Sequence, residues 1–182
     1  MPKSTKHNRA NLAIFIRYRE PKEGGGYTIT MDILEQILKN VKQKKIIFII
    51  LNDKKRSLYQ KISRHGFDCI CLNENIALLK FKSFIFSLIP LLLKFYNFIN
   101  FNKYLNLEKE KKIDMVWFLS AEYYYPLFSK YISTVWDLQH LTHSSFPETG
   151  NYLRRVYRET VIKNFLKNSY KIITGSKILI NL

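Results

Sequence analysis

The sequence predicts an α/β fold with a mostly parallel, doubly wound sheet, and two observations support this. Short apolar runs at residues 11–18, 45–51 and 67–72 alternate with longer stretches of helical period. Polar residues directly follow several of these runs, as they do at the carboxyl edge of a parallel sheet. Because right-handed crossovers connect parallel neighbours, we expect the order to begin β-α-β-α-β.

The first strand, at residues 11–18, leads through a turn that ends in Gly24, Gly25 and Gly26 into a helix. Successive glycines before a helix let backbone N–H groups approach a phosphate or a sugar. The run matches neither G-x-G-x-x-G nor a Walker motif, so a flexible turn is the alternative. The apolar face of the helix recurs every 3.6 residues: Ile29, Ile33, Leu34, Ile37, Leu38 and Val41.

The uninterrupted apolar run 45–51 predicts a central strand that is covered on both faces. Asn52 and Asp53 follow it and can cap the next helix, which we expect to end at Gly66. A third strand is expected at residues 67–72. The inner face of the intervening helix would carry Leu58, Tyr59 and Ile62.

Residues 76–101 contain an uncharged segment, 83–93, that Pro90 interrupts. This segment is too short to cross a bilayer, which needs ~20 apolar residues. We expect a hydrophobic core helix that is broken at Pro90. The alternative is a helix pair half-buried in a membrane surface, whose lysines reach the headgroups.

The charged run 107–112 predicts a solvated surface, and residues 114–119 predict another strand. Ser120 and Glu122 follow this strand and would therefore face the ligand crevice. Tyrosines at 123–125 could stack on a sugar or a base, or pack within the loop.

The segment with the clearest features of a functional site follows a run at residues 131–136 that resembles a strand. Asp137 ends this run, and a polar loop with His140 and Glu148 leads to a helix that begins near Tyr152. Side chains just beyond a strand's carboxyl end face the ligand crevice. Asp137 and His140 are therefore the leading candidates for catalytic residues.

Arginines gather near the start of this helix, at Arg154, Arg155 and Arg158. A guanidinium matches a phosphate in two hydrogen bonds, and cations at a helix start do not complement the helix dipole. This placement indicates an anionic partner, although Arg155 and Glu159 could simply pair. A last strand is expected at residues 169–174.

The composition is strongly basic, with 30 Lys and Arg against 14 Asp and Glu and a net charge of +16. Such a charge attracts polyanions, including an anionic membrane surface, although it can also be only a solvated surface. No zinc-finger spacing or aromatic RNA-binding motif is present, so we expect no nucleic-acid partner. The length predicts a single domain, 11–182, after a basic tail, 1–10.

Cys69 and Cys71 are spaced for the same face of a strand, where a disulfide is sterically unfavourable, and they indicate a reducing compartment. No secretory signal begins the sequence, so we expect a cytoplasmic protein. Within the cytoplasm, it could be a peripheral protein on the inner face of the cytoplasmic membrane. No His/Cys/Asp set has metal-ligand spacing, and neither a metal nor a cofactor is expected.

Several motifs together resemble the N-terminal half of family 4 glycosyltransferases. They are W-D-L-Q-H at 136–140, F-P-E at 146–148, Gly150, the arginine cluster with Glu159, and K-I-I-T-G-S at 171–176. The resemblance implies a GT-B architecture, in which two Rossmann-like domains face each other across a cleft. This chain would be the acceptor-side domain, acting on a cell-envelope or lipid-linked saccharide with a nucleotide sugar as donor.

The resemblance also implies roles for individual residues. Gly25 and Gly26 would line the cleft beneath the donor phosphates, while Asp137 and His140 would lie near the reacting sugar, with Asp137 orienting an acceptor hydroxyl. Trp136 stands where many relatives have a histidine. The further residues expected to bind substrate are Glu122, Glu148, Arg154 and Arg158.

The donor half of a GT-B enzyme has no counterpart in this sequence. We therefore expect either a truncated enzyme or one half of a split enzyme, inactive without a separate C-terminal donor-domain chain. The alternative function is a non-catalytic, membrane-associated binding subunit of a split glycosyltransferase.

Overall fold

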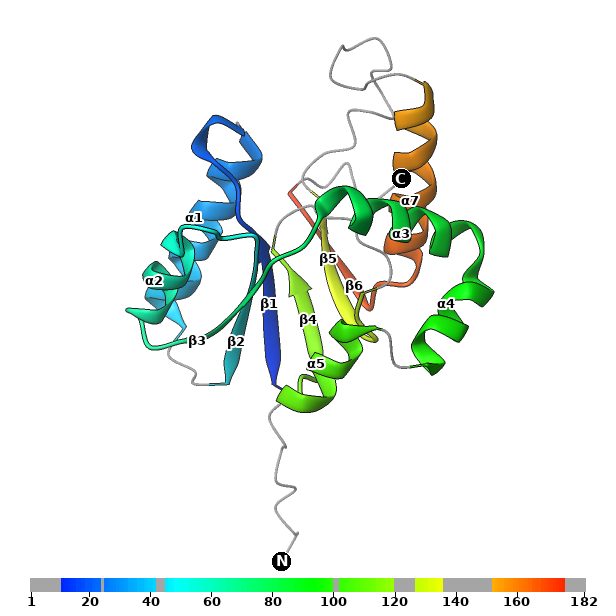
Figure 1. Ribbon diagram of the computed structural model, residues 1–182. Helices are drawn as coiled ribbons and strands as arrows, with labels where there is room; N and C mark the ends of the chain where they lie inside the picture. Colours follow the sequence, from blue (N-terminus) through cyan, green and yellow to red (C-terminus); the bar gives the residue numbers. More distant parts are fainter. Residues whose placement is uncertain are drawn as a thin grey trace, which may run out of the picture.

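The computed structural model describes residues 11–23, 25–41, 45–99, 102–119, 127–135 and 152–175. Within these residues, a parallel six-stranded sheet has the order β3-β2-β1-β4-β5-β6 and carries helices on both faces (Figure 1). The predicted Rossmann-like, doubly wound α/β fold is confirmed. The strands are β1 (Leu12–Arg17), β2 (Ile46–Leu51), β3 (Asp68–Leu72), β4 (Met115–Phe118), β5 (Tyr131–Val135) and β6 (Lys171–Thr174).

The central strand β1 pairs in parallel with both β2 and β4, so that Leu12 lies opposite Ile46 on one side and Met115 on the other. The direction of winding reverses between β1 and β4. In open α/β sheets, ligands bind outside the carboxyl ends of the strands at such a reversal. This order therefore places the candidate crevice beyond the ends of β1 and β4.

One face of the sheet is covered by α1 (Gly25–Asn40) and α2 (Ser57–Ser63), through buried residues such as Leu34 and Ile62. The prediction that Ile29 points inward is wrong, because its side chain is 39% exposed. Thr30 is buried in its place, and its Oγ1 donates to the Gly26 carbonyl at 2.7 Å. This bond satisfies the buried hydroxyl within the helix itself.

The other face is covered by α3 (Ile76–Leu88), α5 (Lys103–Lys111) and α7 (Tyr152–Lys167). Its core is rich in aromatic rings. Tyr131 stacks on Phe165 with ring centroids 4.7 Å apart, and its hydroxyl donates to the Phe165 carbonyl at 2.6 Å. An offset aromatic pair adds stability beyond the burial of its area.

Helix α4 (Pro90–Phe98) follows α3 directly, and the predicted break at Pro90 is confirmed. The prediction that both parts form a core helix is wrong for α4, which has no buried residue. Proline suits the first turn of a helix because the N–H that it lacks would have no partner there. The break thus redirects the chain outward from the sheet.

The charged run 107–112 was expected to be solvated, but the structure buries one of its members. Glu108 is only 7% exposed, and its two carboxylate oxygens accept the backbone N–H of Ser129 at 3.1 and 3.2 Å. Burial raises the pKa of Glu108, and the bonds from Ser129 oppose that rise. This side chain ties α5 to the segment that enters β5.

Candidate functional site

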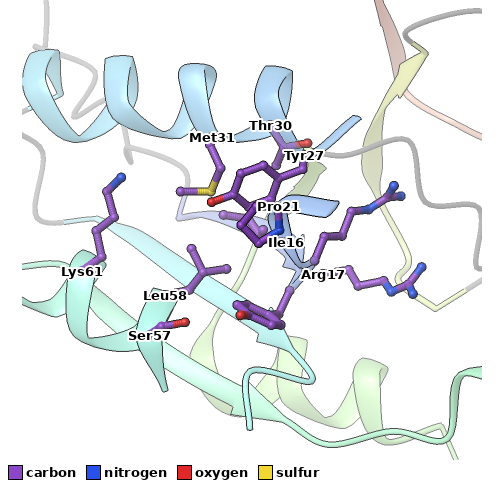
Figure 2. Close-up of a pocket in the computed structure, with 11 residues that line it drawn as sticks. Ile16, Arg17, Pro21, Tyr27, Thr30, Met31, Ser57, Leu58 and Lys61 are labelled. Atoms are coloured by element: carbon purple, nitrogen blue, oxygen red, sulfur yellow. The ribbon is translucent and has the colours of Figure 1, made fainter. Parts of the chain in front are cut away.

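A cavity of about 260 Å³ lies at the carboxyl end of β1, between α1 and α2 (Figure 2). It is on the α1 side of the sheet, and its lining residues come from β1, the turn that follows β1, α1 and α2. The polar residues that line it include Arg17, Arg19, Tyr27, Thr30, Ser57 and Lys61. In Figure 2, Lys61 and Arg17 stand at opposite ends of this row.

The chain turns sharply from β1 into α1 to form one wall of the cavity. Tyr18 continues the strand direction beyond Arg17, since its N–H donates to the Leu51 carbonyl at 2.8 Å. A short 3-10 helix, η1 (Pro21–Glu23), then leads to α1. Pro21 has a fixed φ that favours this tight turn.

Gly26, in the first turn of α1, lies against the guanidinium of Arg19. A Cβ at this position would come within 3.2 Å of Arg19 Nη1. The first turn of α1 carries no acidic residue, and the N–H groups of a first turn have no partner within the helix. Arginine and helix start together make this end of the cavity positive, which favours a phosphate or another anion.

The opposite wall is held in place by Asp53, which is 3% exposed. Asp53 Oδ1 accepts the N–H of Ser57 at 3.0 Å, and Oδ2 accepts the N–H of Tyr59 at 2.9 Å. The predicted capping of α2 by Asp53 is therefore confirmed. On the same wall, Lys61 Nζ forms an ion pair with Glu35 Oε1 at 2.7 Å.

Asn52 has a different role from the capping that was expected of it. Its Nδ2 donates to the Glu74 carbonyl at 3.0 Å, and its Oδ1 accepts the Glu74 N–H at 2.7 Å. These two bonds fasten the exit of β2 to the segment that follows β3. Asn52 adopts φ 62°, a left-handed conformation that asparagine tolerates better than most residues.

The carboxyl ends of β4 and β5 are joined through Thr134, which is 1% exposed. Trp117 Nε1 donates to Thr134 Oγ1 at 3.0 Å, and this hydroxyl donates to the Phe118 carbonyl at 2.6 Å. These two bonds fasten the end of β5 to β4. Asp137 itself lies outside the described residues.

The predicted site residues divide into those that the structure places and those that it does not. Gly25 and Gly26 lie in the first turn of α1, beside the cavity. Arg154 and Arg158 lie in the first half of α7, with side chains outside the described part of the structure. The residues that fall wholly outside it are Glu122, Asp137, His140 and Glu148. Their grouping around one ligand stays a prediction.

Sequence reasoning missed Arg17, Arg19 and Tyr27 as lining residues of the cavity. The signal was present, because the sequence R-Y-R stands at the end of the first predicted strand. The rule that singled out Asp137 after β5 applies equally to polar residues that follow β1.

The described residues include two cysteines. Cys69 and Cys71 are free thiols on β3, and burial raises the pKa of both. In the part of the chain that the structure describes, no three His, Cys, Asp or Glu side chains gather closely enough to hold a metal ion.

No protein-family model and no curated protein sequence matches this chain. The interpretation of the site therefore depends on its geometry and on the motifs.

Proposed function

We propose that this chain is the acceptor-side Rossmann-like domain of a nucleotide-sugar-dependent glycosyltransferase that modifies a cell-envelope or lipid-linked saccharide. The observation that carries the proposal is the cavity at the carboxyl end of β1, where Arg17 and Arg19 stand beside the glycine-bearing start of α1. The strand order supports it, because doubly wound sheets with this order bind phosphorylated ligands at this edge.

Glycosyl transfer needs an acceptor for the proton of the attacking hydroxyl and positive charge for the leaving diphosphate. We assign the first role to Asp137 or His140, which follow β5 in the sequence. The arginines and the start of α1 contribute to the second. A donor-binding domain, supplied by a further segment or by a separate chain, would bind most of the nucleotide sugar.

The proposal is tested by calorimetric titration of the whole chain with a nucleoside diphosphate, a hexose phosphate and inorganic pyrophosphate. Arg19→Gln should weaken binding by about tenfold to a hundredfold, since one charge-assisted hydrogen bond is lost. Gly26→Ala should weaken it less, by displacing the Arg19 guanidinium. Alanine is a better helix former than glycine, so Gly26→Ala should not reduce the thermal stability.

Arg64→Gln is the matched control, because Arg64 is an exposed arginine at the end of α2 that does not line the cavity. Its titration curves should equal those of the wild type. The proposal fails if the wild type binds none of the three ligands, or if Arg64→Gln weakens binding as much as Arg19→Gln.

The alternative is a non-catalytic binding subunit that holds a separate donor-binding chain at a membrane. One observation favours it: the described residues that line the cavity include no carboxylate and no histidine. The two functions differ in the effect of Asp137→Asn in the assembled enzyme. This substitution should abolish transfer but spare ligand binding if the chain is catalytic, and it should leave transfer unchanged if the chain only binds.

A further inference from the structure

The helix pair α3–α4 exposes apolar side chains and buries polar ones. In α3, Ser83 is 1% exposed and Ser87 is 8% exposed, whereas Phe81 is 61% exposed. In α4, which has no buried residue, Phe98 is 81% exposed. Water favours the opposite arrangement, because the burial of apolar rather than polar surface stabilises a fold.

The inner face of α3 consists of Leu79, Ser83 and Ser87, and the exposed Phe81 lies on another side of the helix. The Ser83 hydroxyl donates to the Leu79 carbonyl at 2.9 Å, and the Ser87 hydroxyl donates to the Ser83 carbonyl at 2.7 Å. The Asn164 side chain of α7 donates to the Ser87 carbonyl at 3.4 Å. The small Ser87 thus lets α3 pack closely on α7.

Helix α4 contacts α3 through an aromatic pair and contacts the start of α5 through a side-chain hydrogen bond. The rings of Phe86 and Tyr96 lie 5.2 Å apart, and Lys82 Nζ is 5.5 Å from the centroid of Tyr96. Asn102 donates to the Asn97 side chain at 3.0 Å. Figure 1 shows α4 on the outer side of the molecule, across the sheet from α1 and α2.

Large apolar side chains on α3, on α4 and at the bend between them are exposed, and together they are named the α3–α4 apolar surface. Their exposed fractions range from 49% at Ile89 to 81% at Phe98. A monomeric protein rarely exposes so many large apolar side chains together, and such a surface marks a binding partner. The surface is defined by Phe81, Leu88, Ile89, Leu91, Phe95 and Phe98.

The charge around this surface identifies the partner as anionic. No Asp or Glu occurs between Glu74 and Glu108, whereas Lys80 and Lys94 are exposed on the two helices that carry the apolar surface. Lysine stems can lie along apolar material while their ammonium groups reach a polar layer. A second copy of this +16 chain would bring a like set of charges to the contact, which is unfavourable.

The lengths of α3 and α4 indicate how the protein would contact a bilayer. Among the described residues, no single helix is long and apolar enough to cross a membrane, and α3 and α4 meet the criterion only as a pair bent by 115°. The packing of α3 on α7 also keeps α3 attached to the protein. A helix that is apolar on one face and basic at its edges lies in the plane of the interface.

We propose that α3 and α4 dock this protein on the surface of an anionic phospholipid bilayer, with the α3–α4 apolar surface among the acyl chains and the lysines at the headgroups. This inference uses none of the residues that line the cavity at β1. It can therefore fail while the proposed function stands, and the reverse also holds.

Vesicle co-sedimentation of the whole chain tests the proposal, with vesicles of phosphatidylcholine alone and of an equimolar mixture with phosphatidylglycerol. The wild type should bind the mixed vesicles more tightly. The triple variant Leu91→Gln, Phe95→Gln, Phe98→Gln should lose at least about a hundredfold in affinity. Lys80→Gln and Lys94→Gln should each weaken binding to the anionic vesicles by about fivefold.

Ile29→Gln is the matched control, because it removes a partly exposed isoleucine from α1 on the other side of the sheet. It should bind vesicles like the wild type, and circular dichroism should show all variants folded. In Phe98→Trp, brominated lipids should quench the added fluorescence, whereas in Ile29→Trp they should not.

Three results would overturn the proposal. The first is a wild type that does not bind the mixed vesicles, and the second is a triple variant that binds them unchanged. The third is self-association of the wild type, seen by light scattering, that the triple variant abolishes without any vesicle binding by the wild type. That result would assign the surface to a second copy of the chain.

Discussion

At the scale of single residues, buried side-chain bonds decide how the edge of the sheet is shaped. Asp53 uses both carboxylate oxygens on backbone N–H groups of Ser57 and Tyr59, which otherwise have no partner at the start of α2. The residue at the helix boundary, Arg56, adopts a left-handed φ of 54° and makes no side-chain cap of its own. The capping of α2 therefore depends on Asp53.

We predict that Asp53→Ala lowers the free energy of unfolding by about 2 kcal/mol, because it removes the acceptor of two backbone N–H groups at the start of α2. Asp53→Asn keeps one acceptor oxygen and should cost less. Urea denaturation measures both. Asp68→Ala, which removes an exposed carboxylate from β3, is the control and should change stability by less than about 0.5 kcal/mol. Equal losses for Asp53→Ala and Asp68→Ala would contradict this account.

At the scale of elements, α3 shows why a small side chain can matter more than an apolar one. Buried Ser87 stands where the helix meets α7, since Asn164 of α7 donates to its carbonyl at 3.4 Å, and Phe84 of α3 lies 5.7 Å from Tyr157 of α7, measured between ring centroids. A larger side chain at the buried serine would have to push the helices apart. Packed interiors resist such additions.

We predict that Ser87→Leu destabilises the protein by about 1–3 kcal/mol through overpacking, although leucine is the better helix former. Ser87→Ala should be nearly neutral, since the lost hydroxyl bond is internal to the helix. Lys80→Leu, on the exposed side of the same helix, is the size-matched control. Thermal unfolding measures all three, and a Ser87→Leu variant as stable as Lys80→Leu would contradict the packing argument.

The same elements show which features of the fold can be predicted from the sequence. Apolar runs predicted the described strands, most clearly β2, which is central and covered on both faces, and Asp53 was predicted as a cap because it follows that run. The pairing of β1 with β4 depends on contacts between distant segments, which local patterns do not contain. Periodicity identifies an apolar helix face but not what covers that face, and for this reason α4 was wrongly assigned to the core. Arg19 was missed because its role depends on its position against Gly26 in the folded chain.

At the scale of the whole molecule, charge links stability to pH. The net charge of +16 grows further as carboxylates are protonated, and this self-repulsion weakens the fold in acid. Glu108 acts in the opposite direction. Burial raises its folded pKa above the ordinary value, so the folded state holds this proton more tightly than the unfolded chain does.

We predict that Glu108→Gln gains stability relative to the wild type as pH rises from the ordinary glutamate pKa through the higher folded value of Glu108. Over that window the wild type loses the contribution of the protonated group, whereas the amide stays neutral and can still accept the Ser129 N–H. Subtracting the two unfolding free energies, measured in urea at each pH, removes the shared effect of net charge. Glu110→Gln, exposed on the same helix, is the control for a changed surface charge. A difference that falls with rising pH would show that the bonds from Ser129, rather than burial, dominate the pKa of Glu108.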